Sequence, residues 1–402
     1  MNIFMHKNSI KVIFLFSVLT FASFAGAQKK EEIRWSERMA KSEIKRFPEP
    51  WMIENAKKPR WGYTHGLVVK AMLEEWKHTN NSFYYDYAKI YADSLIDIQG
   101  RIKTYSRSSY NLDNINPGKI LFDLYAKSHD ERYKIAMDTL RQQLREQPRT
   151  SEGGFWHKQR YTNQMWLDGL FMGSPYLAQY GATFADPFVF GDVVNQIKII
   201  ARHTYDPKTG LFYHGWDESK EQQWANKKTG TSPCFWSRSI GWYAASLVDV
   251  LDYLPENTEG RDSVLTIVRT VASGIKKYQD NKSGVWYQVT DQGSRKGNYP
   301  ESSASSLFVY FLCKSINKGY ISKDYIKTAR KGFNGLVRNF MKKESDGTYS
   351  ITNCCSVAGL GGDKVYRDGS FEYYIGEPVI DNDPKSVGSF ILAAIEYEKL
   401  KK

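Results

Sequence analysis

Apolar residues recur with a helical period through much of this chain. In residues 66–78, Val68, Met72 and Trp76 stand four apart, and residues 386–400 repeat the same stripe. Apolar positions at that spacing lie on one face of an α-helix. Strand-like alternation is scarce, and "GVWYQVT" (284–290) is the best candidate strand. The pattern therefore predicts an all-α fold.

Segments rich in aromatic residues, Gly, His, Asp and Asn separate the helical patterns. They recur about every fifty to sixty residues, with one longer interval of about seventy, at Trp61, Tyr110, Trp166, Trp216 and Trp286. A helix, a turn and an antiparallel return helix need about that length, and the chain holds about six such units. Six helical hairpins closed into a toroid fit this spacing, with one set of loops meeting at a mouth and lining a cleft. No Pro/Gly/Ser-rich linker divides the chain, so we expect a single domain.

The N-terminus has the pattern of an export signal. Two lysines precede an apolar run over 12–25, and Ala25 and Ala27 form a small-x-small cleavage pattern. We expect a signal peptide over 1–27 and a catalytic domain over 28–402. The apolar run is too short for a membrane span, so no membrane anchor is expected. Export to the periplasm is the first expectation, and secretion is the alternative.

The chain is basic, with 56 Lys and Arg against 44 Asp and Glu and a net charge of +12. A basic exported protein suggests an acidic partner such as a polyanionic sugar. The positive charges are scattered without a dense run, which argues against a nucleic-acid partner. Simple solubility is the alternative explanation of the charge.

Four cysteines, at positions 234, 313, 354 and 355, are too few for a disulfide scaffold in a chain of 402 residues. Paired metal-ligand spacings are absent, so we expect buried free thiols, one long-range disulfide being the alternative, and no metal site. No phosphate loop or dinucleotide fingerprint is present, and we expect activity without a cofactor.

One carboxylate lies in unusual company. In "YTNQMWLDGLFMGSP" (161–175), Asp168 stands among Met165, Phe171 and Met172, which would share its face if the stretch were helical. Apolar surroundings favour the uncharged form of a carboxyl group. Asp168 is therefore either an acid kept protonated for catalysis or a helix cap turned towards water.

An ordered set of motifs resembles glycoside hydrolase family 105, the unsaturated rhamnogalacturonyl hydrolases, and more distantly the unsaturated glucuronyl hydrolases of family 88. The resemblance spans residues 60–362 and extends towards the C-terminus. It rests on "RWGYTHGL", "NLDNINPGKILFDLY", "GGFWHK", "YTNQMWLDGLFMGSPYLAQYG", "DPKTGLFYHGWDES", "FWSRSIGWY", "YPESSASSLF" and "CCSVAGLG". It implies an (α/α)6 barrel.

The resemblance also implies a reaction on the products of polysaccharide lyases. These lyases leave a uronic acid with a C4=C5 double bond at the non-reducing end. A carboxylic acid protonates this vinyl ether at C4, water adds at C5, and the hemiketal falls apart to release the neighbouring sugar. Because hydration replaces direct displacement, carboxylate separation does not predict the stereochemical outcome.

The family's catalytic acid/base falls on Asp168, and a second cleft carboxylate falls on Asp113. The second carboxylate can hold the first one's proton by repulsion and can bond sugar hydroxyls. An Asx turn is the alternative role of Asp113. His214 matches a substrate-site histidine, next to Trp216, and a structural histidine is the alternative.

The resemblance places further residues at the substrate. Trp236, Arg238 and Trp242 match an aromatic and cationic cluster, in which indole rings stack on the sugar and a guanidinium grips its carboxylate. A buried ion pair is the alternative for Arg238. The remaining expected contacts, with core packing as the alternative for the aromatic ones, are Tyr63, His157, Asn163 and Trp166.

The substrate class stays open between two acidic oligosaccharides. Unsaturated galacturonyl-rhamnose is the first expectation, and unsaturated glucuronyl-rhamnose is the alternative within the same chemistry. Epimerisation or lyase chemistry on the same barrel is a second reading, although seven histidines supply few opposed bases. A carbohydrate-binding protein without catalysis is a third reading, against which the presence of both Asp113 and Asp168 argues. Oligomeric state does not follow from the sequence.

Overall fold

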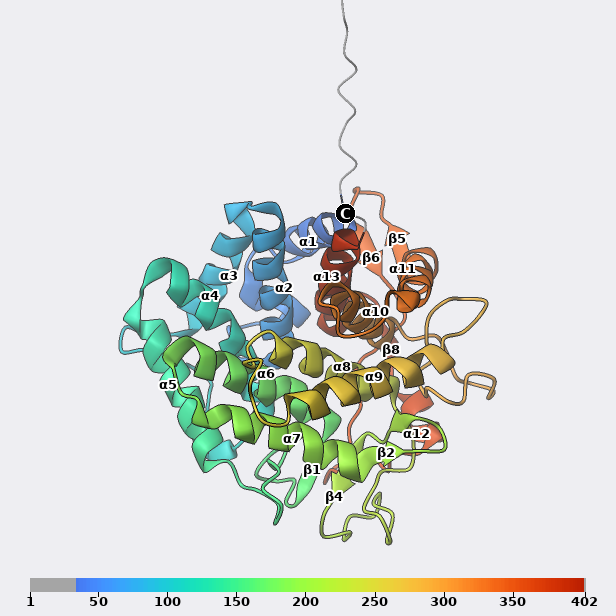
Figure 1. Cartoon of the computed structure of the whole chain (residues 1–402). Helices are drawn as coiled ribbons and strands as arrows, with labels where there is room; N and C mark the ends of the chain where they lie inside the picture. Colours follow the sequence, from blue (N-terminus) through green and yellow to red (C-terminus); the bar gives the residue numbers. More distant parts are fainter. Residues whose placement is uncertain (1–33, 401–402) are drawn as a thin grey trace, which may run out of the picture. The chain divides into compact units, whose positions relative to one another are not determined.

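Two concentric rings of helices form the body of the molecule in the computed structural model, which describes residues 34–400 (Figure 1). Each inner helix contacts the next around the ring, and the last returns to the first. The inner helices are α2 (Tyr63–Thr79), α4 (Lys119–Ser128), α6 (Leu167–Phe184), α8 (Ser237–Leu251), α10 (Ser302–Asn317) and α13 (Pro384–Lys399). The outer helices are α1 (Trp35–Arg46), α3 (Ser82–Leu95), α5 (Glu131–Glu146), α7 (Phe188–Thr204), α9 (Arg261–Lys277) and α11 (Ile326–Phe340).

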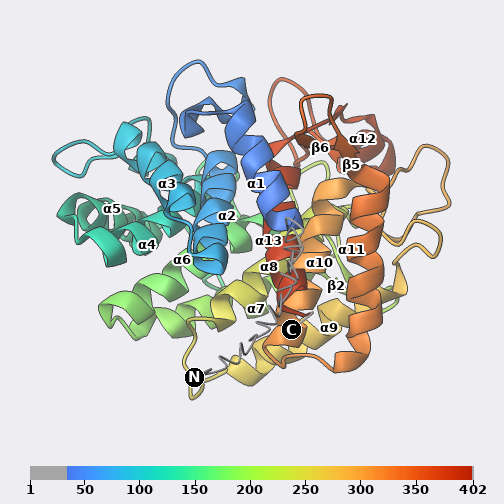
Figure 2. The same ribbon diagram turned by 90° about the horizontal axis from the view of Figure 1, so that it is seen from above.

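Inner and outer helices alternate along the chain, so each inner helix packs against its neighbours in sequence. Figure 2 shows α11 beside α10 and α1 beside α13. This arrangement is an (α/α)6 barrel in one domain, as predicted. The predicted helical stripes over 66–78 and 386–400 lie in α2 and α13.

Burial explains which helices form which ring. In α10, every residue from Ser302 to Ile316 is buried, so the helix has no solvent face. In α11, burial falls on one stripe that includes Ala329, Phe333, Leu336 and Phe340. A helix that is apolar or small on all sides belongs in an interior, whereas an amphipathic helix covers a core. The two patterns place α10 inside and α11 outside.

Short secondary elements lie in the connections. Four antiparallel strand pairs form, β1 with β4, β2 with β3, β5 with β6 and β7 with β8. The strands are β1 (Gln164–Trp166), β2 (Tyr205–Asp206), β3 (Leu211–Phe212), β4 (Gly215–Asp217), β5 (Met341–Lys343), β6 (Tyr349–Ile351), β7 (Cys354–Cys355) and β8 (Val379–Ile380). The remaining short helices are α12 (Phe371–Gly376), η1 (Pro50–Asn55), η2 (Arg107–Ser109), η3 (Leu112–Asn114), η4 (Asn116–Gly118) and η5 (Lys323–Tyr325).

The strand predicted over 284–290 is wrong. This segment makes only isolated bridges, Val289 with Trp236 and Tyr287 with Pro300. Its partners are the segments that lead into α8 and α10, and Pro300 has no amide hydrogen to extend a ladder. The segment therefore bridges two connections without forming a strand.

Loop lengths differ sharply between the two ends of the barrel. The connections that leave inner helices are short, with residues 80–81 between α2 and α3 and residues 129–130 between α4 and α5. The connections that enter inner helices are long, as in 205–236 and 341–383. Long loops with short elements of their own commonly carry function. They collect where the inner helices begin, which we call the N-terminal rim.

Several sequence-based expectations concern other parts of the molecule. All four cysteines are buried free thiols, as predicted. Among the described residues, no helix is both long and apolar enough to cross a membrane. The signal peptide expected over 1–27 lies outside the described residues and stays a prediction.

Candidate active site

The N-terminal rim brings together chemistry-bearing residues from distant parts of the sequence. Tyr63 is the first residue of α2, while Asp168, Arg238 and Lys385 are the second residues of α6, α8 and α13. Asp113 lies in η3, shortly before α4. The N-terminus of a helix carries partial positive charge and unsatisfied N–H groups. Inner helices that begin at one rim therefore make this end of the barrel attractive to anions.

Asp168 is the one partly exposed residue in a long buried segment. All residues from Gln164 to Gly181 are buried except Asp168, whose side chain is 13 % exposed. The helix cap facing water that the sequence left open would expose the carboxylate far more. Asp168 therefore has mostly buried surroundings with an outlet to solvent.

The strand before α6 corrects one detail of the sequence analysis. Met165 was expected on the helical face of Asp168, but α6 begins at Leu167 and Met165 lies in β1. Met165 pairs there with Trp216 of β4. The antiparallel pair places the β4 chain, with the adjacent His214, against the start of α6.

A chain of polar contacts leads from the Asp168 carboxylate to Tyr374. Oδ2 of Asp168 lies 3.0 Å from Nε2 of His214, although neither atom makes a hydrogen bond within residues 34–400, and Nδ1 of His214 lies 2.7 Å from the Tyr374 hydroxyl. The backbone N–H of Leu167 donates to the carbonyl of His214 and holds the loop at the helix start. Burial lowers the pKa of His214, against the opposing charge of Asp168, and so favours the neutral ring. A neutral ring that accepts from Tyr374 at Nδ1 carries its proton on Nε2, facing Asp168.

Asp113 is held in its ionised form by two neighbours. Its Oδ2 lies 2.5 Å from the Lys158 ammonium, and its Oδ1 lies 3.3 Å from Nε2 of His157. Burial alone would raise the pKa of Asp113, but the charges of Lys158 and His157 outweigh burial and lower that pKa well below its usual range. The turn at this point is capped by Asn111, whose Oδ1 accepts a hydrogen bond from the backbone N–H of Asp113. The Asp113 carboxylate itself contacts Lys158 and His157, so the Asx-turn role weighed for Asp113 belongs to Asn111.

Gly169 lets these two acidic groups share one site. A Cβ atom at this position would lie 3.0 Å from Nδ1 of His157 and 3.1 Å from Cδ1 of Leu112. Leu112 precedes Asp113, and His157 contacts its carboxylate, so both pack against the first turn of α6. The missing side chain of Gly169 brings the Asp113 cluster next to Asp168.

The guanidinium of Arg238 has one nitrogen, Nη1, that is hydrogen-bonded and another, Nε, that has no partner among the described residues. Its Nη1 donates to the Cys355 carbonyl and, at 3.2 Å, to the Ser303 hydroxyl, and it lies 3.9 Å from Glu301 Oε1. Nε is buried and has no hydrogen-bond partner within residues 34–400. The buried ion pair that was the alternative for Arg238 is present. It occupies Nη1 and leaves Nε as an unused donor.

The tryptophans expected at the substrate are all buried, at 5 % exposure or less. Trp166 stacks on His157 at 4.6 Å, and Trp236 donates to Gln288 and stacks on Tyr374. Trp216 stacks on His203 of the outer helix α7, and Trp242 packs on Phe171. Core packing, the alternative left open, describes Trp216 and Trp242 best. A substrate contact for these rings stays a prediction.

The other expected contacts lie on the rim. Tyr63 is half-buried, and its pKa is raised by burial and by the charge of Asp113, against Lys385 and Arg238. Asn163 has a left-handed backbone with φ of 60° and accepts a hydrogen bond from the Glu218 N–H at its carbonyl. Asparagine tolerates that conformation well, so Asn163 shapes the turn before β1.

The structure adds residues that sequence reasoning missed. Lys158 pairs with Asp113, Glu301 pairs with Arg238, and Tyr374 supports His214. Lys158 and Glu301 stood inside the quoted motifs, and Lys158 directly follows the expected residue His157, which was a usable signal. Tyr374 lies 160 residues from His214, and no local pattern marks that contact.

A groove of about 590 Å³ opens beside Tyr63 on the same rim. It joins the start of α2 to the segment before α13. Its polar and charged lining residues are Arg46, Glu54, Asn55, Arg60, Thr64, Ser356, Asp381, Asn382, Asp383 and Lys385. Within the described part of the chain, no group of three or more His, Cys, Asp or Glu residues could hold a metal ion.

An (α/α)6 barrel whose acidic, histidine and arginine side chains meet at one rim has the architecture of a helical-barrel carbohydrate-active enzyme. The family comparison is more specific. The model of Glycosyl Hydrolase Family 88 matches residues 35–401, and the chain belongs to this family of glycoside hydrolases.

Known proteins agree with this membership. A solved structure described as a family 105 glycoside hydrolase from C. acetobutylicum ATCC 824 is 40% identical, with a TM-score of 0.87, over 91% of this chain and 99% of that one. Protein Atu3128 of Agrobacterium fabrum is 36% identical over 56% of this chain and 97% of its own length. The unsaturated rhamnogalacturonyl hydrolase YesR of Bacillus subtilis is 23% identical over 61% of this chain and 68% of its own length.

Proposed function

We propose that this glycoside hydrolase removes a 4,5-unsaturated uronic acid from the non-reducing end of lyase products in which that acid is joined to rhamnose. Membership in the family and the name of the relative YesR support the substrate class. The observation that carries the proposal is the position of Asp168, which reaches solvent from a buried segment and contacts His214 at 3.0 Å.

Asp168 would act first as an acid and then as a base. It transfers a proton to C4 of the C4=C5 bond, which leaves positive charge shared between C5 and the ring oxygen. As its conjugate base, Asp168 takes a proton from the water that bonds to C5. The resulting hemiketal opens, C1 becomes a hemiacetal, and its collapse to an aldehyde releases the neighbouring sugar as an alcohol. One water is consumed, and Asp168 ends in its starting state.

The polar neighbours hold the carboxylate in position for these steps. The His214 N–H on Nε2 would orient Oδ2, which leaves Oδ1 for the proton that moves to C4. Tyr374 holds the tautomer of His214 through Nδ1. Asp113, kept ionised by Lys158, would accept hydrogen bonds from sugar hydroxyls.

Arg238 would bind the carboxylate of the unsaturated ring. A guanidinium holds a carboxylate through two parallel N–H donors. Because Nη1 is engaged by Ser303 and Cys355, the edge formed by Nε and Nη2 is the one that fits this role. The positive ends of the inner helices add to the attraction for an anionic sugar. The groove beside Tyr63 and Lys385 would then receive the sugar that is released.

Export stays part of the proposal. The signal pattern over 1–27 and the basic composition suit a protein that meets acidic oligosaccharides in the periplasm. Expression of the full chain followed by N-terminal sequencing of the product tests this point, because export predicts a chain that begins at Gln28.

The activity test follows the ultraviolet absorbance of the conjugated double bond. Wild-type protein and Asp168→Asn would be mixed with unsaturated galacturonyl-rhamnose and, separately, with unsaturated glucuronyl-rhamnose. Loss of absorbance is expected for wild type, with a rate about 10²- to 10⁴-fold lower for the variant. The preferred disaccharide identifies the uronic acid of the substrate. Equal rates for both proteins would mean that a residue other than Asp168 is the catalytic acid. No loss of absorbance with either sugar would favour the hypothesis of a binding protein without catalysis.

A further inference from the structure

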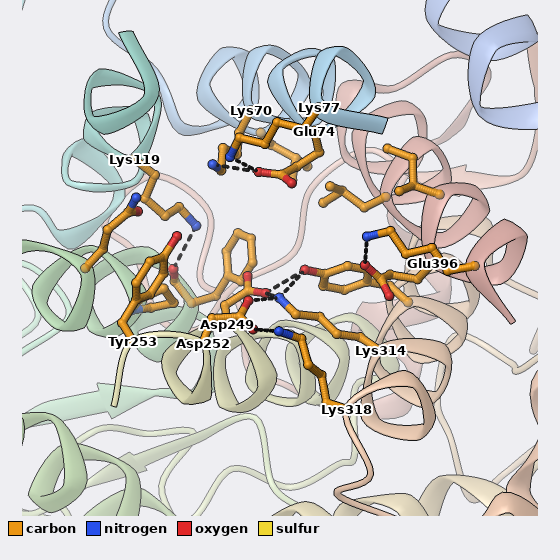
Figure 3. A pocket seen from close by; sticks show the side chains of 18 residues that line it. Lys70, Glu74, Lys77, Lys119, Asp249, Asp252, Tyr253, Lys314, Lys318 and Glu396 are labelled. Carbon is orange, nitrogen blue, oxygen red and sulfur yellow. Dashed lines mark hydrogen bonds and ion pairs between the residues drawn. The ribbon is translucent and has the colours of Figure 1, made fainter. Parts of the chain in front are cut away.

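A second polar cavity lies inside the inner ring, away from the N-terminal rim. Its volume is about 320 Å³, and each inner helix or its end contributes to the lining (Figure 3). We call it the basal cavity. It is lined by Leu67, Lys70, Glu74, Lys77, Lys119, Phe171, Pro175, Gln179, Asp249, Asp252, Tyr253, Tyr310, Lys314, Lys318, Leu392, Ile395, Glu396 and Lys399.

Most charges in the basal cavity neutralise one another. Every carboxylate in the lining has a lysine partner, and Lys70 contacts Glu74 at 2.8 Å while Lys314 contacts both Asp249 and Asp252 at 2.6 Å. Further pairs lie closer to solvent. They join Lys77 to Glu74, Lys318 to Asp252 and Lys399 to Glu396.

Lys119 is the exception among these lysines. It is 5 % exposed and points into the cavity (Figure 3), yet no carboxylate of residues 34–400 lies within ion-pair distance of it. Its Nζ donates to the Phe171 carbonyl at 3.3 Å. That carbonyl lacks its helical partner because Pro175, four residues on, has no N–H. This bond uses one of three ammonium donors and leaves two for a ligand.

The surroundings make Lys119 receptive to a negative charge. Burial, with help from the charges of Lys70 and Lys314, lowers the pKa of Lys119 to about 7 against the influence of Asp249. An anion beside the ammonium would offset this cost and restore the charged form. Binding of an anion above neutral pH would therefore take up a proton.

The remaining lining residues of the basal cavity indicate which groups the rest of the ligand carries. The Phe171 ring lies 3.7 Å from Nζ of Lys119, and Leu67, Leu392 and Ile395 add apolar surface. Carboxylate oxygens of Glu74 and Asp249 face the same space and accept hydrogen bonds. A carbon skeleton that presents C–H groups on one face and carries hydroxyl groups fits both kinds of wall.

We propose that the basal cavity binds a small hydroxylated monocarboxylate, about the size of one hexuronic acid, with its carboxylate on Lys119. One unpaired ammonium matches one negative charge. A dianion such as phosphate would place its second charge near Asp249 and Glu74 without a free cation to balance it. The proposal does not depend on catalysis at the N-terminal rim.

Calorimetric titration with galacturonate tests the basal cavity in the full chain. Lys119→Met keeps the length of the side chain and removes its charge, and Lys399→Met is the matched control at the mouth, where the lysine is 44% exposed. We expect Lys119→Met to lose one binding event, with affinity at least about tenfold weaker, and Lys399→Met to keep it within about threefold. Identical isotherms for wild type and Lys119→Met would overturn the proposal. Lys119-dependent binding of neutral galactose, or of phosphate in preference to galacturonate, would also overturn it.

A second measurement needs no variant. Titration of wild-type protein at pH 8 in buffers of different ionisation enthalpy should show uptake approaching one proton for each galacturonate in this event. Net proton release on binding would contradict a carboxylate on Lys119. The catalytic test is separate, because Lys119→Met should turn over substrate near the wild-type rate. Asp168→Asn, in turn, should retain the Lys119-dependent binding.

Discussion

Asp168 and His214 meet at 3.0 Å between Oδ2 and Nε2, at the point where the β4 loop passes the start of α6. The imidazole is fully buried, whereas the carboxylate reaches solvent. One residue thus reaches solvent at the rim, and the other contacts it from the buried side.

Tyr374→Phe should lower kcat with little change in KM. The phenyl ring keeps its packing on Trp236 and loses the hydroxyl at Nδ1 of His214. Without it, the imidazole can turn or change tautomer, and the Asp168 carboxylate loses a fixed partner. Supporting contacts of this kind cost about 10- to 100-fold when removed. Tyr373→Phe, one residue earlier on α12, is the control and should stay near wild type.

Lys158→Met should shift the acidic limb of the kcat/KM profile to higher pH. Lys158 is the main influence that lowers the pKa of Asp113, so its loss raises that pKa. As the pH falls, Asp113 of the variant is therefore protonated at a higher pH than Asp113 of wild type. Activity that needs the ionised carboxylate is lost at that higher pH. The profile should be measured with Lys208→Met, on the exposed β2–β3 turn, as the control. An unshifted acidic limb would remove Asp113 from the proposed mechanism.

Gly169→Ala should reduce activity more than stability. The added Cβ meets Nδ1 of His157 at 3.0 Å and pushes the Asp113 cluster away from Asp168. Small displacements of catalytic groups cost about 10²-fold in rate. Gly173→Ala is the matched control one turn later, because its Cβ would lie 3.5 Å from Leu112 in ordinary contact. Similar kcat/KM values for the two variants would show that the close approach is not needed.

Glu75→Gln should stabilise the protein above neutral pH. Burial of Glu75 in α2 raises its pKa from 4.5 to about 7. Between these values the folded state holds a proton that the unfolded state has released, so the free energy of unfolding falls as pH rises through this window. Glutamine cannot ionise, and the gain at pH 8 should reach at most about 3 kcal/mol.

Urea unfolding of Glu75→Gln at pH 4 and pH 8 checks this sign. The variant and wild type should agree at pH 4, where Glu75 is protonated in both states. Glu256→Gln, exposed in the connection after α8, should change stability at neither pH. A variant that is less stable than wild type at pH 8 would mean that the ionised carboxylate has a stabilising partner.

Local sequence patterns were enough to predict the ring architecture, and they pointed to the candidate site. Helical stripes, such as that through Val68 and Met72, set the helices, and the aromatic segments between them became the long rim loops. Asp168 stood out because a charge in an apolar run is costly to bury. These features are local in sequence, because helix periodicity and burial cost act over neighbouring residues.

The tertiary structure alone decided the partners and the exposure of the site residues. Lys158 pairs with Asp113 across 45 residues, and Tyr374 reaches His214 across 160. The tryptophans are buried by contacts outside their own segments, as Trp236 is by Tyr374, and the Lys119 ammonium meets the carbonyl freed by Pro175 on another helix. Such contacts depend on how helices pack around the barrel axis, which no local pattern encodes.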